Sequence, residues 1–173
     1  MGIQLSDIGQ FLGIVAIFFG FLTFQMKSRE KLILFQVCAA GSFMLHYLLI
    51  GAYSGMALNA VAMIRNIIFY YIGGSKPVTK KWALLFTGIM GIMGIVSWHA
   101  WYSVFMVLGL LINSYCMSLS NPQMIRKSIL ITSPLVLIYN LFVLSVGGIV
   151  YESVAIISSL IGIFRARNDS LLR

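Results

Sequence analysis

The chain has 173 residues, of which 60% are hydrophobic and only 9% are charged. Soluble domains carry about 25% charged residues, and a soluble fold of this length could not bury so much apolar surface, so the composition excludes an ordinary soluble protein. The net charge of +8 does not indicate nucleic-acid binding, because the basic residues form short clusters between apolar runs. We therefore predict an integral membrane protein.

Seven apolar runs follow one another along the chain. Each approaches the length of about 20 residues that a helix needs to cross a bilayer. Glycine, proline, serine, asparagine or a charge cluster separates the runs, as in turns between helices. The predicted helices cover residues 8–24, 32–50, 56–72, 82–98, 101–119, 125–146 and 149–164. Because several connections are short, consecutive helices should be antiparallel neighbours.

The basic residues alternate along this series and so predict an orientation. Of the 12 lysines and arginines, all except Arg65 follow the first, third, fifth or seventh predicted helix. They are Lys27, Arg29, Lys31, Lys76, Lys80, Lys81, Arg126, Lys127, Arg165, Arg167 and Arg173. Since cytoplasmic loops are rich in lysine and arginine, the N-terminus should lie outside and the C-terminus in the cytoplasm.

The first three predicted helices are similar to the last three at a shift of 93 residues. This shift places Gly55 on Gly148 and residues 61–62, Val-Ala, on residues 154–155, which are also Val-Ala. We predict an all-α membrane protein in which two parallel three-helix repeats are joined by a linker helix, a 3+1+3 arrangement. The divisions are residues 1–74 for the first repeat, 75–100 for the cytoplasmic loop and linker helix, and 101–173 for the second repeat with its basic tail.

Polar residues inside the predicted helices mark the candidate site. An ionisable side chain in the bilayer interior costs several kcal/mol unless it is paired or hydrated, so each is a functional candidate. The third helix carries polar residues on one face, and the seventh carries polar residues at the equivalent positions. The candidate substrate-binding residues are Asn59, Arg65, Asn66, Glu152, Ser159, His46 and Asn140.

These residues also have structural interpretations. Arg65 could pair with Glu152, directly or through water, or extend to the cytoplasmic headgroups. Glu152 could instead stand in water at the outer interface. Asn59, Asn66 and Ser159 could simply form hydrogen bonds to neighbouring helices.

Two further helices carry candidates of a different kind. His46 could relay protons, or it could be a hydrogen-bonded packing residue. Asn140 stands one position after the residue that aligns with His46. Pro134 removes a backbone hydrogen bond and kinks its helix, either as a hinge or for packing alone.

No motif of a soluble enzyme is present, so we expect neither an enzyme nor a cofactor or metal site. Cys38 and Cys116 fall inside apolar runs, and we interpret them as small apolar residues rather than as a disulfide. The expected partners are a small-molecule solute and the lipid bilayer, without nucleic acid. Seven helices could complete a pathway alone, and a homo-oligomer is equally compatible.

The residues 46–55, His-Tyr-Leu-Leu-Ile-Gly-Ala-Tyr-Ser-Gly, are followed by Asn59 and by residues 64–66, Ile-Arg-Asn. This pattern, with Glu152 and residues 163–165 in the second half, resembles the YgjV-type bacterial inner membrane proteins. The resemblance implies a location in the bacterial inner membrane. That family is similar to the MtN3/SWEET and PQ-loop transporters, which implies three-helix-bundle repeats and alternating access but no particular substrate.

The chain departs from PQ-loop proteins at their defining motif. Those proteins carry Pro-Gln in the first helix of each repeat. Here residues 24–25 are Phe-Gln, and residues 122–123, Pro-Gln, follow the fifth helix. The resemblance therefore supplies no hinge at these positions.

The expected function is transport or facilitated passage of a small polar solute, sugar-like or a small anionic metabolite, by alternating access between the repeats. The alternative is a non-transporting scaffold of the inner membrane, or an assembly or lipid-interacting protein.

Overall fold

The computed structural model describes residues 5–26, 28–73, 78–119 and 121–171. The basic residues Lys27, Lys76 and Arg173 lie outside the described residues, and the side chains of Arg165 and Arg167 are not described either.

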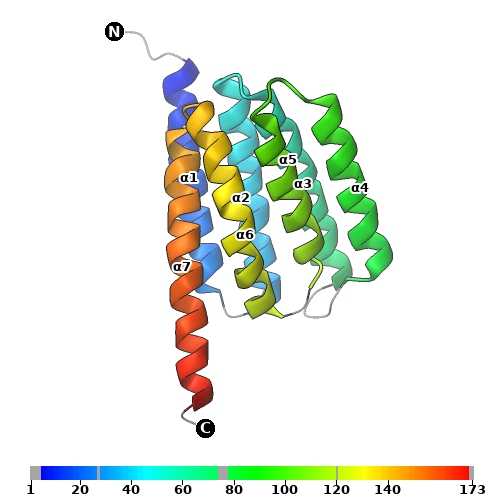
Figure 1. The fold of residues 1–173 in the computed structure, drawn as a ribbon, viewed down its shortest axis with the longest axis vertical. Coiled ribbons are helices and arrows are strands. Elements are labelled where there is room, and N and C mark those ends of the chain that lie inside the picture. Colours follow the sequence, from blue (N-terminus) through cyan, green and yellow to red (C-terminus); the bar gives the residue numbers. More distant parts are fainter. Residues whose placement is uncertain (1–4, 27, 74–77, 120, 172–173) are drawn as a thin grey trace.

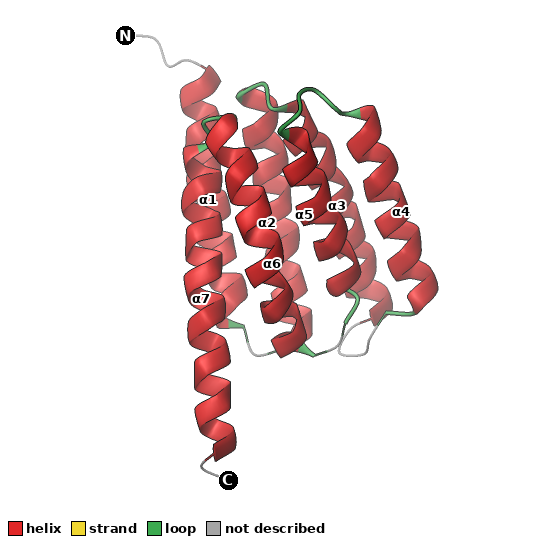
Figure 2. Cartoon of the chain, viewed as in Figure 1, coloured by secondary structure: helices red, strands yellow, loops and turns green. Residues whose placement is uncertain are grey.

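All regular elements in the described part of the chain are helices (Figure 2). Their bounds are α1 Leu5–Gln25, α2 Arg29–Leu49, α3 Tyr53–Gly73, α4 Lys80–Val96, α5 Ser103–Cys116, α6 Pro122–Phe142 and α7 Val146–Leu171. The predicted seven helices are thus confirmed, although α5 is shorter than predicted and α7 continues beyond residue 164.

Four helical segments are both long and apolar enough to cross a membrane: Arg29–Leu49, Tyr53–Gly73, Gln123–Phe142 and Val146–Phe164. The segments Asp7–Thr23 and Ser103–Cys116 are apolar but shorter. These assignments cover only the residues that the structure describes. They confirm an all-helical protein with several potential membrane spans.

Six of the helices form a closed ring. Around the ring, α1 packs on α2, α2 on α3, α3 on α5, α5 on α6, α6 on α7, and α7 on α1 again (Figure 1). The remaining helix, α4, lies outside the ring against α3 and α5. Since α1 begins at one end of the bundle and α7 ends at the other, the chain crosses the bundle an odd number of times.

The bounds of α2 and α6, and the starts of α3 and α7, follow the shift of 93 residues, whereas the bounds of α1 and α5 do not. Both α2 and α6 have 21 residues, and their first residues, Arg29 and Pro122, are separated by this shift. The described residues with positive φ, Gly51 at 74° and Leu144 at 53°, are also 93 positions apart, and each follows the second helix of its half. The same shift places α1 on α5 and α3 on α7, so the contact of α1 with α7 corresponds to the contact of α5 with α3.

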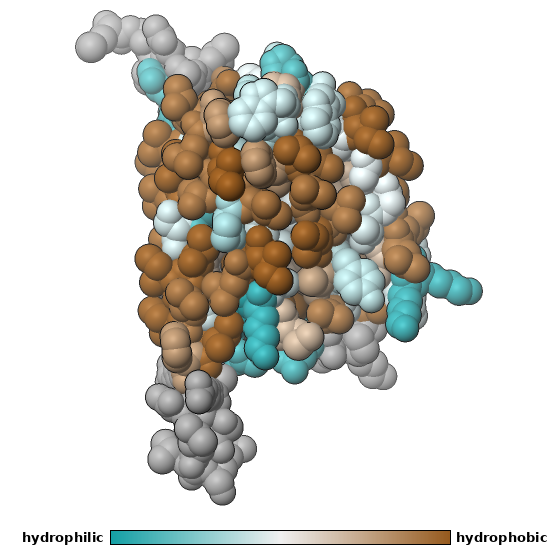
Figure 3. All heavy atoms as spheres, viewed as in Figure 1, coloured by the Kyte–Doolittle hydropathy of each residue, from teal (hydrophilic) through white to brown (hydrophobic). Residues whose placement is uncertain are grey.

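The outer surface of the bundle is suited to lipid. Large exposed hydrophobic side chains occur on all seven helices, and Figure 3 shows them covering most of the visible face. Exposed lysines stand near the starts of α2, α4 and α6, which lie at the same end of the bundle: Lys31, Lys80, Lys81 and Lys127. Hydrophilic side chains likewise gather near the lower end in Figure 3.

Two glycines allow α1 and α7 to approach closely. A Cβ atom added at Gly147 would lie 2.6 Å from the Gly13 Cα, which is backbone and cannot rotate away. A Cβ atom added at Gly88 of α4 would meet no atom within 4 Å. The close contact of α1 with α7 therefore requires a glycine at position 147.

We expect Gly147→Ala to lower the free energy of unfolding by about 1–3 kcal/mol, the usual cost of overpacking a filled site. The matched control is Gly88→Ala, which should be neutral or stabilising, because alanine favours a helix over glycine by about 1 kcal/mol. Thermal unfolding in detergent checks both variants. Equal midpoints for the two would contradict the close contact of α1 and α7.

Candidate functional site

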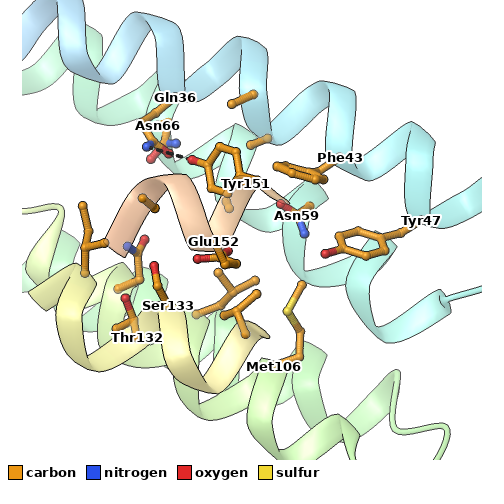
Figure 4. Close-up of a pocket in the computed structure, with 18 of the residues that line it drawn as sticks. Gln36, Phe43, Tyr47, Asn59, Asn66, Met106, Thr132, Ser133, Tyr151 and Glu152 are labelled. Atoms are coloured by element: carbon orange, nitrogen blue, oxygen red, sulfur yellow. Dashed lines mark hydrogen bonds between the residues drawn. The ribbon is translucent and has the colours of Figure 1, made fainter. Parts of the chain in front are cut away.

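A cavity lies inside the ring of helices and is lined by side chains of α2, α3, α5, α6 and α7 (Figure 4). Its volume, measured as the space open to the centre of a water molecule, is about 70 Å³. One water needs about 10–15 Å³ of such space, so the cavity can hold several waters or a small solute. Its polar lining consists of Gln36, Tyr47, Asn59, Arg65, Asn66, Asn113, Thr132, Ser133, Tyr151 and Glu152.

Most of the lining positions correspond between the two halves at the shift of 93 residues. The corresponding pairs in the lining are Gln36 and Ile129, Ala39 and Thr132, Ala40 and Ser133, Phe43 and Val136, Asn59 and Glu152, and Ala62 and Ala155. The cavity is therefore lined largely by corresponding positions of α2 and α6 and of α3 and α7.

Arg65 is the most deeply buried charged residue of the site, with 1% of its surface exposed. Its Nε and Nη2 atoms donate hydrogen bonds of 3.0 and 2.9 Å to the Asn66 Oδ1. Its Nη2 also donates to the Asn113 Oδ1 at 3.4 Å, and its Nη1 has no partner. Arg65 lies eight residues before Gly73, the last residue of α3, which is about 12 Å at a rise of 1.5 Å per residue, and its guanidinium stays in the interior with Asn66 and Asn113. It does not extend to the headgroups.

Glu152 enters the same cavity from α7, on the other side of the site, with 9% of its surface exposed. Ser133 lies beside its carboxylate in the lining of the cavity. Among the described contacts, no hydrogen bond or ion pair joins Glu152 to Arg65. A direct pair of these two residues is therefore not formed, although both face the same cavity.

A family model described as a bacterial inner membrane protein, Imp-YgjV, matches residues 7–170. The chain belongs to this family. The match confirms the resemblance to YgjV-type proteins and indicates a multi-pass protein of the bacterial inner membrane. No curated protein and no solved structure matches the chain.

The remaining predicted residues of this YgjV-family chain divide between the cavity and its surroundings. Asn59 lines the cavity, and its Nδ2 donates to the Gly55 carbonyl at 2.9 Å. Ser159 is fully buried with its hydroxyl unpartnered, but it is not part of the lining. Pro134 lies inside α6 and is exposed on its outer side, so it contributes no side chain to the site.

His46 of α2 lies outside the cavity and forms hydrogen bonds to α1 and to the connection between α6 and α7. Its Nδ1 lies 2.8 Å from the Gly9 carbonyl oxygen, and its Nε2 lies 2.6 Å from the Ser145 Oγ. A carbonyl only accepts, so Nδ1 carries the proton and Nε2 of the neutral ring accepts from the serine hydroxyl. This geometry corresponds to the packing interpretation of His46.

Asn140 is fully buried beside the cavity and takes part in a layer that closes it on one side. The Tyr47 ring lines the cavity, and its hydroxyl donates a hydrogen bond to the Asn140 Oδ1 at 2.6 Å. The Tyr139 hydroxyl accepts from the Gly55 backbone N–H at 3.0 Å. Tyr139 also borders a second hollow, of about 140 Å³, which is formed with the α2–α3 and α4–α5 connections. Tyr47, Tyr139 and Asn140, which we call the tyrosine layer, thus separate the central cavity from a hollow at the end of the bundle.

A second contact crosses the ring at its opposite end. Arg29, at the start of α2, has 4% of its surface exposed. Its Nε donates to the Leu119 carbonyl at 3.1 Å, and its Nη2 donates to the Met117 carbonyl at 3.3 Å. These carbonyls follow the C-terminal end of α5, where the helix dipole favours a positive charge. Arg29 therefore joins the two halves at the end rich in lysine.

Our prediction of the site omitted several of its residues. Tyr47, Gln36 and Tyr151 line the cavity, and the Gln36 Nε2 donates to the Tyr151 hydroxyl at 3.4 Å (Figure 4). The internal similarity could have indicated Tyr47, because it corresponds to Asn140. Thr132 and Ser133 correspond to two alanines, so no polar pattern common to both halves marks them.

We expect Tyr47→Phe to lower the free energy of unfolding by about 1–3 kcal/mol, because it leaves the buried Asn140 Oδ1 without its donor. The matched control is Tyr71→Phe, since Tyr71 is 81% exposed and such changes fall within about 0.5 kcal/mol. Thermal unfolding of the two variants in one detergent makes the comparison. A Tyr47→Phe midpoint equal to that of Tyr71→Phe would show that the Tyr47–Asn140 hydrogen bond contributes nothing.

Proposed function

We propose that this YgjV-family protein transports or facilitates the passage of a small polar solute across the inner membrane. The observation that supports this proposal is the polar cavity of about 70 Å³ at the junction of the two halves, α1–α3 and α5–α7, with a buried arginine in its wall. In membrane transporters built from repeats, the substrate site lies near the bilayer midplane at the interface of the repeats. Passage proceeds by alternating access, in which one end of the cavity opens while the other is closed.

The proposal includes seven transmembrane helices in a 3+1+3 arrangement. Two halves, α1–α3 and α5–α7, form the ring, and α4 links them from outside. The coincidence of helix bounds at a shift of 93 residues supports this arrangement, as does the equivalence of the two ring-closing contacts. It resembles the parallel repeats of SWEET-like transporters.

The proposed orientation places the N-terminus outside and the C-terminus in the cytoplasm. The exposed lysines at the starts of α2, α4 and α6 support it, because cytoplasmic ends of membrane helices are rich in basic residues. On this orientation, the tyrosine layer of Tyr47, Tyr139 and Asn140 closes the outer side, and Arg29 stands at the inner side.

Each closure includes a small number of hydrogen bonds between parts of the chain, beside buried apolar side chains. A typical hydrogen bond contributes about 0.5–1.5 kcal/mol net, and bonds from a charged donor about 1.5–3 kcal/mol. Exchange between closed and open arrangements is compatible with contacts of this size. Pro134 in α6 removes one backbone hydrogen bond from the helix that carries Asn140, and it is the candidate point of bending.

The alternative function, a non-transporting scaffold, is favoured by one observation. The Arg65 guanidinium is bonded directly to Asn66 and Asn113, as expected where polar side chains hold helices together. The space beside these groups and the unpartnered Arg65 Nη1 favour transport instead.

Labelling of introduced cysteines tests whether water reaches the cavity. In a chain with Cys38 and Cys116 replaced by alanine, we expect Asn59→Cys and Glu152→Cys to react with a charged thiosulfonate reagent. The reacting species is the thiolate, which forms in water but not in hydrocarbon. Mass spectrometry measures the extent of labelling.

The matched control for labelling is Ile64→Cys, because Ile64 is 50% exposed on the outer surface of α3 and should face lipid. We expect no reaction at this position. If neither cavity cysteine reacts from either side of the membrane, the proposed transport pathway is wrong and the scaffold interpretation is favoured.

A further inference from the structure

The guanidinium of Arg65 uses only one of its two binding edges fully. The edge formed by Nε and Nη2 is occupied by the Asn66 Oδ1, which accepts from both atoms. The edge formed by Nη1 and Nη2 has only the 3.4 Å contact from Nη2 to the Asn113 Oδ1. The Nη1 is buried and has no partner.

Asn66 adds a second unused donor at the same place. Because its Oδ1 accepts from Arg65, its Nδ2 is a donor, and this atom is also buried without a partner. Arg65 and Asn66 both line the central cavity and have 1% of their surfaces exposed. The cavity wall therefore contains a charged donor and a neutral donor, both without an acceptor.

The charge of Arg65 is also not neutralised by a contact. Its partners are amide oxygens, and among the described residues no carboxylate is paired with it. Glu152 faces the same cavity, but among the described contacts no hydrogen bond or ion pair joins it to Arg65. A buried guanidinium without a counter-ion is strongly favoured to bind an anion, and its planar fork matches the two oxygens of a carboxylate.

We propose that the Nη1–Nη2 edge of Arg65, together with the Asn66 amide, binds the carboxylate group of a small organic anion in the central cavity. This names the solute class for the proposed transport function and rests on that function. The cavity volume of about 70 Å³ limits the solute to a few non-hydrogen atoms, as in formate, acetate or lactate. Hydroxyl groups on the solute have partners in Asn59, Thr132 and Ser133, which line the same space.

Thermal unfolding of the full-length protein in detergent tests the carboxylate site. Formate, acetate and lactate are compared with chloride at equal ionic strength, and with the neutral amides formamide, acetamide and lactamide. At a concentration ten times the Kd, a carboxylate should raise the midpoint by about 3–5 °C, and the amides should not. Phosphate serves as a second anion.

Variants of Arg65, of its neighbour Asn66 and of Arg126 show which residue binds the carboxylate. Arg65→Gln should abolish the response to carboxylates. Arg65→Lys keeps the charge without the fork, so the response should weaken, and this variant serves also if Arg65→Gln does not fold. Asn66→Ala should weaken it as well. The matched control is Arg126→Gln, because Arg126 lies near the start of α6 and outside the cavity lining, and it should respond as the unaltered protein does.

The variant Glu152→Gln distinguishes a carboxylate bound by Arg65 from one bound elsewhere in the cavity. If the carboxylate binds at Arg65, Glu152→Gln should keep the response or increase it, because a negative charge is removed from the cavity. A loss of response in Glu152→Gln equal to that in Arg65→Lys would overturn the assignment.

The proposal is overturned if no carboxylate shifts the midpoint, if the amides shift it equally, or if Arg65→Lys responds like Arg126→Gln. A larger, Arg65-dependent response to phosphate would also overturn it, since the site would then be one for tetrahedral oxyanions. Cysteine labelling of the cavity is independent of the solute. A cavity that reacts with thiosulfonate but ignores carboxylates would reject the solute class while leaving transport intact.

Discussion

The structure depends on the burial of one guanidinium in the middle of a helical bundle. Arg65 lies deep in α3, where lipid offers no hydrogen-bond partner, so its partners must come from the protein. The Asn66 Oδ1 accepts from two of its nitrogens, and Asn113 extends the contact to α5. A ring of six helices provides this interior, while apolar side chains cover the outside. The helix outside the ring, α4, contributes no side chain to the cavity.

At the shift of 93 residues, α2 and α6 share both bounds and α3 and α7 share their first position, but their side chains differ. Asn59 of α3 corresponds to Glu152 of α7, and both line the cavity. Tyr47 of α2 corresponds to Asn140 of α6, and these residues form a hydrogen bond to each other across the ring. Similar backbones therefore bring equivalent positions together, while different side chains make one side of the cavity a donor of hydrogen bonds and the other an acceptor.

The helices and the polar face of α3 could be predicted from the sequence, because hydropathy and helical spacing depend only on local residues. The contacts between faces could not. The spacing gave no sign that Glu152 lies beside Ser133 rather than against Arg65, because this depends on how α6 and α7 pack. The sequence also left open whether Arg65 reaches the headgroups. The burial of its side chain and its contact with Asn113 exclude that, and both require α5 to lie beside α3. His46 was ambiguous for the same reason, since its partner Ser145 is 99 residues away.

Polar contacts cross the ring at both ends of the bundle, and buried apolar side chains, such as Ile33 and Ile125, lie between Arg29 and the cavity. At one end, Tyr47 and Tyr139 bond to Asn140 and to the Gly55 backbone. At the other end, Arg29 bonds to carbonyls that follow α5. An apolar plug would gain stability in proportion to its buried area, so opening it would expose that area to water. A hydrogen bond opened toward water is replaced by a bond to water, so its net cost is small. The polar contacts therefore contribute little to the cost of opening once water enters, and the larger part of that cost is the exposure of the buried apolar side chains beside them.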